Sequence, residues 1–249
     1  MKRNEIYLGD CLELMPKHVE DKSIDMIFCD LPYGTTQNKW DSVIPLDKLW
    51  SEYVRVIKDN GAIVLFSAQP FTSVLVSSNL KMFKYEWVWN KVVPTNHLNA
   101  KRQPMRLHEN ICVFYKKQCT YNRQMTDKPK EYQRPNRKLV KDAFYETKNY
   151  GDANRGFAED SDHTKTNPKT IVKFSNGNGY SKKGNHPTQK PLDLIEYMIK
   201  TYTNEGDLIL DNTCGSGTTG LGAKNLNRDY IMMEQDPKYY ETACKRVLT

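Results

Sequence analysis

Two short segments combine residue types that catalysis and ligand binding need. Near the start of the chain, an apolar run ends in the sequence C-D-L-P-Y-G at residues 29–34, which places a carboxylate, a rigid turn and an aromatic ring together. Near the end, another apolar run leads into Asp211 and the glycine-rich loop at residues 215–220. A loop of this kind lets a ligand approach bare backbone. The first segment therefore suits polar catalysis, and the second suits ligand binding.

The glycine-rich loop fits the pattern G-x-G-x-x-G between a predicted strand and a predicted helix. Glu234 ends the next predicted strand, where an acid would accept hydrogen bonds from both hydroxyls of a ribose. A nicotinamide dehydrogenase also combines a glycine-rich loop with an acid at the end of the next strand. However, only 15 residues follow Glu234, and a dinucleotide fold needs several more strand–helix units after the loop. No Gly-Lys-Ser/Thr follows the loop, which excludes a Walker loop. The remaining strands must therefore precede the loop, so the predicted sheet is circularly permuted.

The first segment suits the activation of an exocyclic amine. Such an amine on a nucleobase is a poor nucleophile because its lone pair is delocalised into the ring. Asp30 offers a carboxylate acceptor for the N–H bonds, and the Leu31 carbonyl offers a second acceptor. Pro32 fixes the turn, and Tyr33 supplies a ring face for stacking. Transfer would then depend on positioning and electrostatics, and a base stacked in a duplex would have to flip out to reach this pocket.

These segments together resemble the S-adenosylmethionine-dependent amino DNA methyltransferases, the N6-adenine and N4-cytosine family. The first segment resembles their catalytic (D/N/S)-P-P-Y tetrapeptide, with Leu31 in place of the first proline; the role there belongs to a backbone carbonyl. The sequence H-P-T-Q-K-P at residues 186–191 matches the helix-entry motif of the family in full. The catalytic segment precedes the cofactor loop, as in the circularly permuted β group of this family.

The resemblance implies S-adenosylmethionine as the cofactor and gives roles to individual residues. Asp211 and the loop amides from Gly215 to Thr218 would hold the methionine end. Glu234 would hold the ribose, and Asp10 would lie near the adenine. The predicted catalytic residues are Asp30, Leu31, Pro32 and Tyr33, and the predicted cofactor-binding residues are Asp10, Thr188, Lys190, Asp211, Gly215, Gly217, Thr218 and Glu234.

The positive charge of the chain is concentrated in one segment. The net charge is +7, and residues 116–184 hold 16 Lys and Arg against 8 Asp and Glu, whereas the rest of the chain holds 21 against 22. Eight aromatic residues lie among these charges between Tyr121 and Tyr180. Basic side chains neutralise phosphates and aromatic rings stack on bases. We therefore expect this segment to contact nucleic acid, with Arg134, Arg137, Lys182 and Lys183 among the contacting residues.

Hydrophobic patterning predicts an α/β fold in which strands alternate with helices. The resemblance makes the expected sheet seven-stranded, mostly parallel and Rossmann-like, with residues 1–115 as the catalytic half and 185–249 as the cofactor half. Residues 116–184 form the predicted inserted target-recognition lobe, in which only Leu139-Val140 and Ile171-Val172 offer seeds for a small core. The expected strands are 6–8, 24–29, 62–66, 85–89, 111–115, 207–210 and 230–233, and the expected helices are 45–57 (stopped by Asn60-Gly61), one from Pro191, 218–226 and one capped by Asp236-Pro237.

Composition narrows the class of protein further. No run of eighteen apolar residues exists, so we expect no membrane span, and the N-terminus lacks the apolar region of a secretory signal. The six cysteines form no C-x-x-C pair, and Cys29, Cys112 and Cys214 lie in or beside apolar runs. We therefore expect buried free thiols in a cytoplasmic protein. No His/Cys spacing resembles a metal site.

The sequence thus predicts a site-specific DNA methyltransferase that acts on adenine N6 in double-stranded DNA. A cytosine-N4 DNA methyltransferase shares nearly all of the motifs. The further alternatives are an RNA adenine methyltransferase and a non-catalytic DNA-binding regulator on the same fold. A homodimer and a cognate restriction enzyme are possible partners that the sequence leaves open.

Overall fold

The computed structural model describes residues 1–34, 42–132, 164–175 and 189–248 of the chain. The chain divides into two compact units: the sheet unit, Met1–Asn122 with Lys169–Thr249, and the small unit, Arg123–Pro168. In the small unit, β6 (Thr126–Asp127) pairs antiparallel with β7 (Lys165–Thr166). The division of the chain at residues 116 and 184 into three functional segments stays a prediction.

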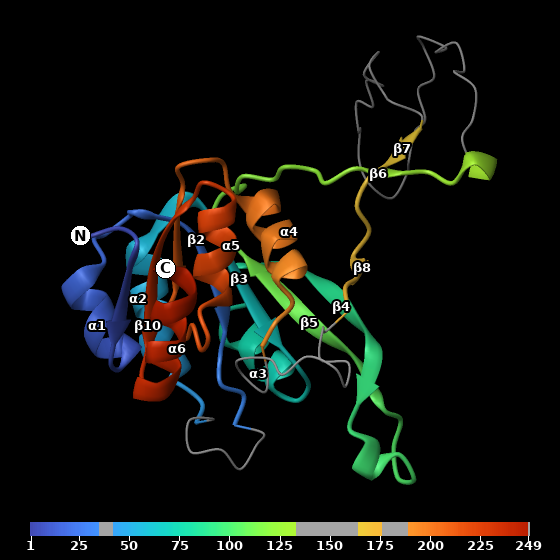
Figure 1. Ribbon diagram of the computed structural model, residues 1–249, viewed down its shortest axis with the longest axis horizontal. Helices are drawn as coiled ribbons and strands as arrows, with labels where there is room; N and C mark the ends of the chain where they lie inside the picture. The colour runs from blue at the N-terminus through green and yellow to red at the C-terminus, as the bar shows by residue number, and fades with distance from the viewer. Residues whose placement is uncertain (35–41, 133–163, 176–188, 249) are drawn as a thin grey trace. The chain divides into compact units, whose positions relative to one another are not determined.

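One large sheet organises the sheet unit (Figure 1). Its eight strands lie in the order β1-β10-β9-β2-β3-β5-β4-β8. All neighbouring strands are parallel except that β5 runs antiparallel to β3 and to β4. The strand bounds are β1 Glu5–Leu8, β2 Ile24–Asp30, β3 Ile57–Ser67, β4 Phe83–Thr95, β5 Arg106–Phe114, β8 Ile171–Lys173, β9 Leu208–Asp211 and β10 Asp229–Glu234.

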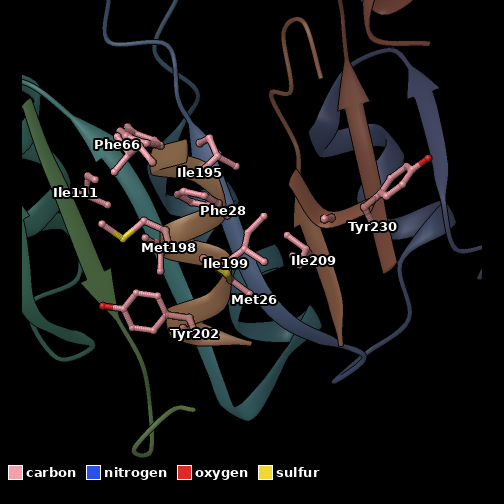
Figure 2. Packing of buried hydrophobic residues seen from close by; sticks show 14 of the residues in the cluster. Met26, Phe28, Phe66, Ile111, Ile195, Met198, Ile199, Tyr202, Ile209 and Tyr230 are labelled. Atoms are coloured by element: carbon pink, nitrogen blue, oxygen red, sulfur yellow. The ribbon is translucent and has the colours of Figure 1, made fainter. Parts of the chain in front are cut away.

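Among the described residues, three helices pack on each face of the sheet. One buried cluster joins α1, α2 and α3 to one face, and a second joins α4, α5 and α6 to the other. Figure 2 shows the second cluster, in which Met198 and Ile199 of α4 pack beside Phe28 of β2. The helix bounds are α1 Cys11–His18, α2 Leu46–Val56, α3 Phe71–Ser78, α4 Leu192–Tyr202, α5 Thr218–Asn225 and α6 Pro237–Val247.

Two features explain the predicted helices: an apolar face, as in α2, and capping residues at the N-terminus, as in α6. In α2 the buried residues Leu49, Trp50, Tyr53 and Val56 recur at helical spacing. In α6 the Asp236 side chain accepts hydrogen bonds from the backbone N–H groups of Lys238 and Tyr239, and Pro237 occupies the first turn. Helices were expected at four places, and the structure confirms them as α2, α4, α5 and α6.

The start of β3 differs from the prediction. Asn60-Gly61 was expected to stop the second helix, but α2 ends at Val56 and β3 already begins at Ile57. Gly61 therefore lies inside a strand, where an added Cβ would come within 2.8 Å of the Asp25 carbonyl oxygen. Its glycine is explained by this close approach of the neighbouring strand and not by a helix end.

The fold class is confirmed as a mostly parallel α/β sheet with helices on both faces, and it has one strand more than seven. The additional strand, β8, pairs parallel with β4, and its Val172 is buried in the main core. Ile171-Val172 was expected to seed a separate core of the inserted lobe, so that expectation was wrong for this dipeptide; Leu139-Val140 lies outside the described residues. None of the helices in the described part of the chain has the length and hydropathy needed to cross a bilayer.

Candidate active site

Four acidic residues meet at the carboxyl edge of the sheet. The parallel strands β1, β10, β9 and β2 are neighbours in that order. The last three end at Glu234, Asp211 and Asp30, and Asp10 follows the end of β1 by two residues. From β2 the sheet grows through β3 on one side, and from β9 it grows through β10 and β1 on the other. The boundary between β2 and β9 is thus a topological switch point, where open α/β sheets bind ligands.

A cavity of about 560 Å³ opens at this edge. Ligand pockets usually have volumes of about 300–1,000 Å³. Gly217 is not among the lining residues, and Thr188, Arg134, Arg137, Lys182 and Lys183 lie outside the described residues. The predicted catalytic and cofactor-binding residues that line the cavity are Asp10, Asp30, Leu31, Pro32, Tyr33, Lys190, Asp211, Gly215, Thr218 and Glu234.

The end of the cavity formed by Asp211 and Glu234, here called the cofactor end, holds two buried carboxylates. Asp211 is 3% exposed and Glu234 is 8% exposed. Asp211 Oδ1 accepts a hydrogen bond of 3.1 Å from the Thr213 N–H. Glu234 accepts from the N–H groups of Gly215 (2.8 Å) and Asp236 (2.9 Å). Glu234, the last residue of β10, is thus hydrogen-bonded directly to the glycine loop after β9.

Burial shifts both of these carboxylates towards the neutral form. It raises the pKa of Asp211 to about 7, against the hydrogen bonds from Thr219 and Thr213. Burial also raises the pKa of Glu234, although the N–H groups of Asp236 and Gly215 oppose this shift. Neither acid forms an ion pair with a lysine or arginine of the described residues. A cationic ligand would therefore find unneutralised acceptors here.

Backbone conformation and packing explain why glycine occupies positions 215 and 217 of the loop. Gly215 and Gly217 both adopt positive φ angles, 53° and 76°, a region that side chains other than glycine rarely enter. An added Cβ on Gly217 would lie 3.0 Å from the Ala243 Cβ and the Val247 Cγ2 of α6. Gly217 thus serves the turn and its packing on α6, and its predicted contact with the cofactor stays a prediction.

Asp10 has a structural role that the sequence did not assign. It is the N-cap of α1, where its Oδ1 accepts a hydrogen bond of 2.7 Å from the Leu12 N–H. The preceding Gly9 donates its N–H to the Glu234 carbonyl at 2.9 Å. This contact holds the Asp10 turn beside the end of β10, at the edge of the cavity.

At the other end of the cavity, here called the catalytic end, Asp30 already has partners. Its Oδ1 accepts a hydrogen bond of 2.7 Å from the Tyr33 hydroxyl, and its Oδ2 lies 2.6 Å from the Lys190 Nζ. Lys190 was predicted to contact the cofactor; the structure places its ammonium group against the Asp30 carboxylate. The Tyr33 ring stacks on Phe71, with centroids 5.2 Å apart, so one face of this ring is already covered.

Lys190 continues into a chain of alternating charges. Its Nζ lies 3.3 Å from Glu109 Oε2 as an ion pair, and Glu109 Oε1 lies 3.1 Å from the Lys91 Nζ. Burial opposes the charge on Lys190, but Asp30 and Glu109 outweigh it and raise the pKa of the ammonium. Burial likewise opposes ionisation of Glu109, but Lys190 and Lys91 hold its pKa below the usual value. Asp30, Lys190, Glu109 and Lys91, here called the ion-pair chain, thus alternate acidic and basic side chains, each in contact with the next.

Glu109 and Lys91 were missed by the sequence analysis. Glu109 lies in β5, two residues before the apolar run Ile111–Phe114, and Lys91 lies in β4, two residues after Trp89. Lys91 is 4% exposed. A charged residue close to the apolar residues of a buried strand is the sequence signal that could have indicated such an ion pair, because a buried charge requires a partner.

The two sequence segments are joined directly. The Thr213 hydroxyl donates to the Asp30 carbonyl at 3.1 Å. Next to it, Asn212 Oδ1 accepts from the Tyr53 hydroxyl (2.6 Å) and the Cys29 thiol (2.9 Å). The expectation of buried free thiols is confirmed for Cys29, Cys112 and Cys214. Within the described ranges, no group of three or more His, Cys, Asp or Glu side chains is arranged to hold a metal ion.

Known proteins resemble this chain in sequence and in fold. A family model described as DNA methylase, for N6 and N4 methyltransferases, matches residues 24–245. The Type II methyltransferase M.HpaI of Haemophilus parainfluenzae is 30% identical over 247 residues, which cover 93% of this chain and 70% of that protein. The Type II methyltransferase M2.MboI of Moraxella bovis is 28% identical over 272 residues, which cover 98% of this chain and 88% of that protein.

Solved structures agree with the family model. The crystal structure of the M1.HpyAVI–SAM complex matches with a TM-score of 0.64 and 25% identity, covering 98% of this chain and 99% of that chain. PvuII DNA methyltransferase, described as cytosine-N4-specific, has a TM-score of 0.67 at 17% identity, covering 100% and 88%, and so shows likeness of fold alone. The sequence match, the sheet and the two joined motifs lead to one conclusion: this chain belongs to the DNA methylase family of S-adenosylmethionine-dependent amino-methyltransferases.

Proposed function

We propose that this protein transfers a methyl group from S-adenosylmethionine to N6 of a flipped-out adenine in double-stranded DNA. The observation that carries the proposal is the electrostatic contrast within one cavity. Asp211 and Glu234 lie buried without a basic partner among the described residues, whereas Asp30 is neutralised by Lys190. The first end suits a cationic methyl donor, and the second suits a neutral base.

The residues at the cofactor end fit S-adenosylmethionine, which supplies an electrophilic methyl group on a sulfonium centre. Asp211 and the loop amides from Gly215 to Thr218 would hold its methionine end, Glu234 its ribose, and Asp10 would lie near its adenine. Two buried polar atoms of the cavity lining, Gln189 Oε1 and Asn212 Nδ2, have no hydrogen-bond partner among the described residues. Buried polar atoms are normally paired, so a polar ligand in this cavity would satisfy them. A contact from Thr188 stays part of this proposal.

At the catalytic end, Asp30 and the Leu31 carbonyl would accept the two N–H bonds of the target amine. These acceptors raise the electron density on the amine nitrogen, and the turn at Pro32 fixes their direction. Lys190 and Tyr33 hold the Asp30 carboxylate through both of its oxygens, so we assign them a positioning role. The amine nitrogen would gain the methyl group as the carbon–sulfur bond of the donor breaks and a neutral thioether leaves. The methylated nitrogen must then lose one proton, and we assign Asp30 as the acceptor.

Residues 116–184 would supply the target-recognition surface, because the excess positive charge of the chain lies there. The expected phosphate contacts at Arg134, Arg137, Lys182 and Lys183 stay predictions. Reversing the charge of Lys182 and Lys183 should flatten the dependence of DNA affinity on salt by up to about 0.9 for each phosphate that is no longer neutralised, without changing cofactor affinity. A slope that stays the same would place the phosphate-binding surface elsewhere.

A homodimer and a cognate restriction enzyme also stay proposals. The Type II names of the relatives make a cognate restriction enzyme worth testing.

Cytosine N4 is the second candidate target. It is also an exocyclic amine beside a ring nitrogen, and the Asp30 pocket offers the same acceptors to either base. The choice of adenine rests on the resemblance: in the family, an aspartate at the first position of the tetrapeptide leans toward adenine and a serine toward cytosine. An RNA adenine target would require the basic segment to bind single strands or RNA shape. A non-catalytic regulator would not need the neutralised Asp30 pocket beside an intact cofactor end.

The test is to methylate unmethylated plasmid DNA with the purified protein and to weigh the nucleosides after digestion. N6-methyladenine is the expected product, and sequencing of the same plasmid would give the target site. N4-methylcytosine without N6-methyladenine would overturn the choice of base. Methylation of RNA but not of DNA would overturn the choice of nucleic acid.

A further inference from the structure

The hairpin between β4 and β5 has a surface that neither the cavity nor the basic segment explains. Its strands pair as far as Thr95 and Arg106, and Asn96–Met105 forms the tip. Figure 1 shows the hairpin extending away from the helices of the sheet unit. All residues from Lys101 to Leu107 are exposed. Leu98, in a short 3-10 turn of the tip, has a relative exposure of 101%, the highest among the exposed large hydrophobic residues of the described chain.

The tip is ordered by its own hydrogen bonds. The Arg102 and Gln103 N–H groups both donate to the Asn99 carbonyl, at 2.8 and 3.0 Å, and the Asn99 side chain donates to Asn96 Oδ1 at 2.8 Å. Asn96 itself has a φ of 72°. A turn held in this way keeps Leu98 pointing outward at a fixed place, although exposure of a leucine to water is unfavourable.

The strand leading to the tip is also irregular. Strand pairing shifts between Asn90 and Thr95, and Val92 has a φ of 68°. A positive φ is a genuine outlier for a β-branched residue. The Asn90 side chain supports it by accepting the Val92 N–H at 2.9 Å. Such strain persists where the surrounding structure fixes it, often near functional sites.

The hairpin begins at the catalytic end of the cavity. Lys91, Thr95 and Arg106 line the cavity, and Lys91 belongs to the ion-pair chain through Glu109. The Lys91 Nζ also donates to the Thr95 hydroxyl at 3.2 Å. The base of the hairpin is therefore tied to the Asp30 pocket.

The charge of the tip favours a polyanion as its partner. Residues 91–108 contain four Lys and Arg and no Asp or Glu. Lys101, Arg102 and Arg106 form no ion pair with described residues. Exposed apolar side chains accompany these charges, which is the combination found where proteins insert an apolar wedge between bases and hold the phosphates on either side. These apolar residues are Val92, Val93, Leu98, Met105 and Leu107.

We propose that this hairpin tip enters the duplex beside the target base, with Leu98 as an apolar wedge and Lys101 and Arg102 on the flanking phosphates. A base must leave the stack to reach Asp30, and unstacking is unfavourable. An inserted leucine would fill the space that the base leaves and so hold it in the pocket. This inference rests on the proposed methylation of double-stranded DNA.

The test compares two duplexes that carry the target site once sequencing has given it. In one the target base is paired, and in the other it lies opposite an abasic position and is already free to leave the stack. Leu98→Ser should lower the methylation rate on the paired duplex by about tenfold or more, and much less on the abasic duplex. The matched control is Leu80→Ser, since Leu80 is also strongly exposed (67%) but lies in the turn before β4, far along the strand from the tip.

Each outcome of the Leu98→Ser experiment supports or contradicts the proposal that Leu98 enters the duplex. An unchanged rate on the paired duplex, or an equal loss on both duplexes, would contradict it. A change in oligomeric state of Leu98→Ser without DNA would assign the tip to a second copy of the chain and would also overturn it. If the wild-type protein methylates neither duplex, the proposed function itself has failed, which is a separate result.

The charges of the tip have their own readout. Lys101→Glu with Arg102→Glu should reduce the slope of log affinity against log salt by about two, since each neutralised phosphate contributes about 0.9. The control is Lys81→Glu with Lys84→Glu, a pair with the same charge change near the other end of β4. An equal change in slope for both pairs would reduce the tip to general surface charge and would overturn its placement on the duplex.

Discussion

Asp211 and Glu234 at the cofactor end of the cavity have no basic partner in the described part of the chain, whereas Asp30 at the catalytic end lies 2.6 Å from the Lys190 ammonium. Burial raises the pKa of Asp211 to about 7 and also raises the pKa of Glu234. At the catalytic end, lysines hold the pKa of Glu109 low. Carboxylates thus lie at both ends of the cavity in different surroundings. Those at the cofactor end would need a positive charge from a ligand, whereas lysines already balance the charge of those at the catalytic end.

Under the proposed function, this difference would explain how one cavity distinguishes its two ligands. A positively charged methyl donor gains from the unneutralised acids and would meet Lys190 unfavourably at the other end. A neutral base needs acceptors of fixed direction, which the ion-pair chain and Tyr33 provide around Asp30. Substitutions at the two ends should therefore have separable effects on transfer and on cofactor binding.

The largest effect is expected at Asp30. Asp30→Asn should lower kcat by roughly a hundredfold or more, because the amide is a weaker acceptor for the amine and for its proton. Affinity for S-adenosylmethionine, measured by calorimetric titration, should stay near that of the wild type. Asp47→Asn, at an exposed aspartate of α2, is the control and should change neither quantity. Substantial turnover by Asp30→Asn would remove the catalytic role.

The corresponding change at the cofactor end is Glu234→Ala. It should weaken S-adenosylmethionine binding by about 1–3 kcal/mol, because the ribose hydroxyls and the Gly215 N–H would lose their acceptor. Titration calorimetry measures this directly, with Glu205→Ala, at an exposed glutamate before β9, as the control. An unchanged affinity would exclude Glu234 from the binding site.

A smaller effect is expected within the ion-pair chain. Glu109→Gln would leave Lys91 without an ion-pair partner and Lys190 with Asp30 alone, so kcat should fall by about tenfold with little change in cofactor affinity. A double-mutant cycle with Lys190→Met distinguishes positioning from general destabilisation, because residues that act as a pair give non-additive effects. Additive losses in kcat would mean that Glu109 does not act through Lys190. Glu241→Gln, at an exposed glutamate of α6, serves as the control.

Most of the cavity could be predicted from sequence because its acids follow apolar strands. The runs that end at Asp30, Asp211 and Glu234 are short and distinct, and parallel strands bring their carboxyl ends to one edge. The ion-pair chain could not be predicted in the same way. Its members Glu109 and Lys91 depend on the antiparallel pairing of β4 with β5, which brings together residues that no local pattern links.

Short elements were also beyond local patterns. The helix α1 contains Pro16 and has only two buried residues, Cys11 and Met15, and α3 is eight residues long with Pro70 at its N-cap. Neither was predicted, because each takes its stability from packing on the sheet and not from its own sequence. The strand β8 was missed for the same reason, since only Val172 of its three residues is buried.

The linkage between Asp211 and the cofactor tests the contrast between the two ends most directly. The pKa of Asp211 in the unliganded protein is about 7, above its value of about 3.9 in an unfolded chain. Its contribution to stability is therefore present below the unfolded pKa and is lost as pH rises through about 7. A bound cation would favour the ionised form, so binding below about pH 7 must release a proton and become weaker as pH falls.

The decisive measurement is calorimetric titration of S-adenosylmethionine at about pH 6 and about pH 8, in buffers of different ionisation enthalpy. For the wild-type protein we expect net proton release and weaker binding at the lower pH, and little proton release at the higher pH. In Asp211→Asn the proton release should shrink and the affinity should depend less on pH. Binding of the wild type with no proton release at either pH, and with equal affinity, would contradict the account.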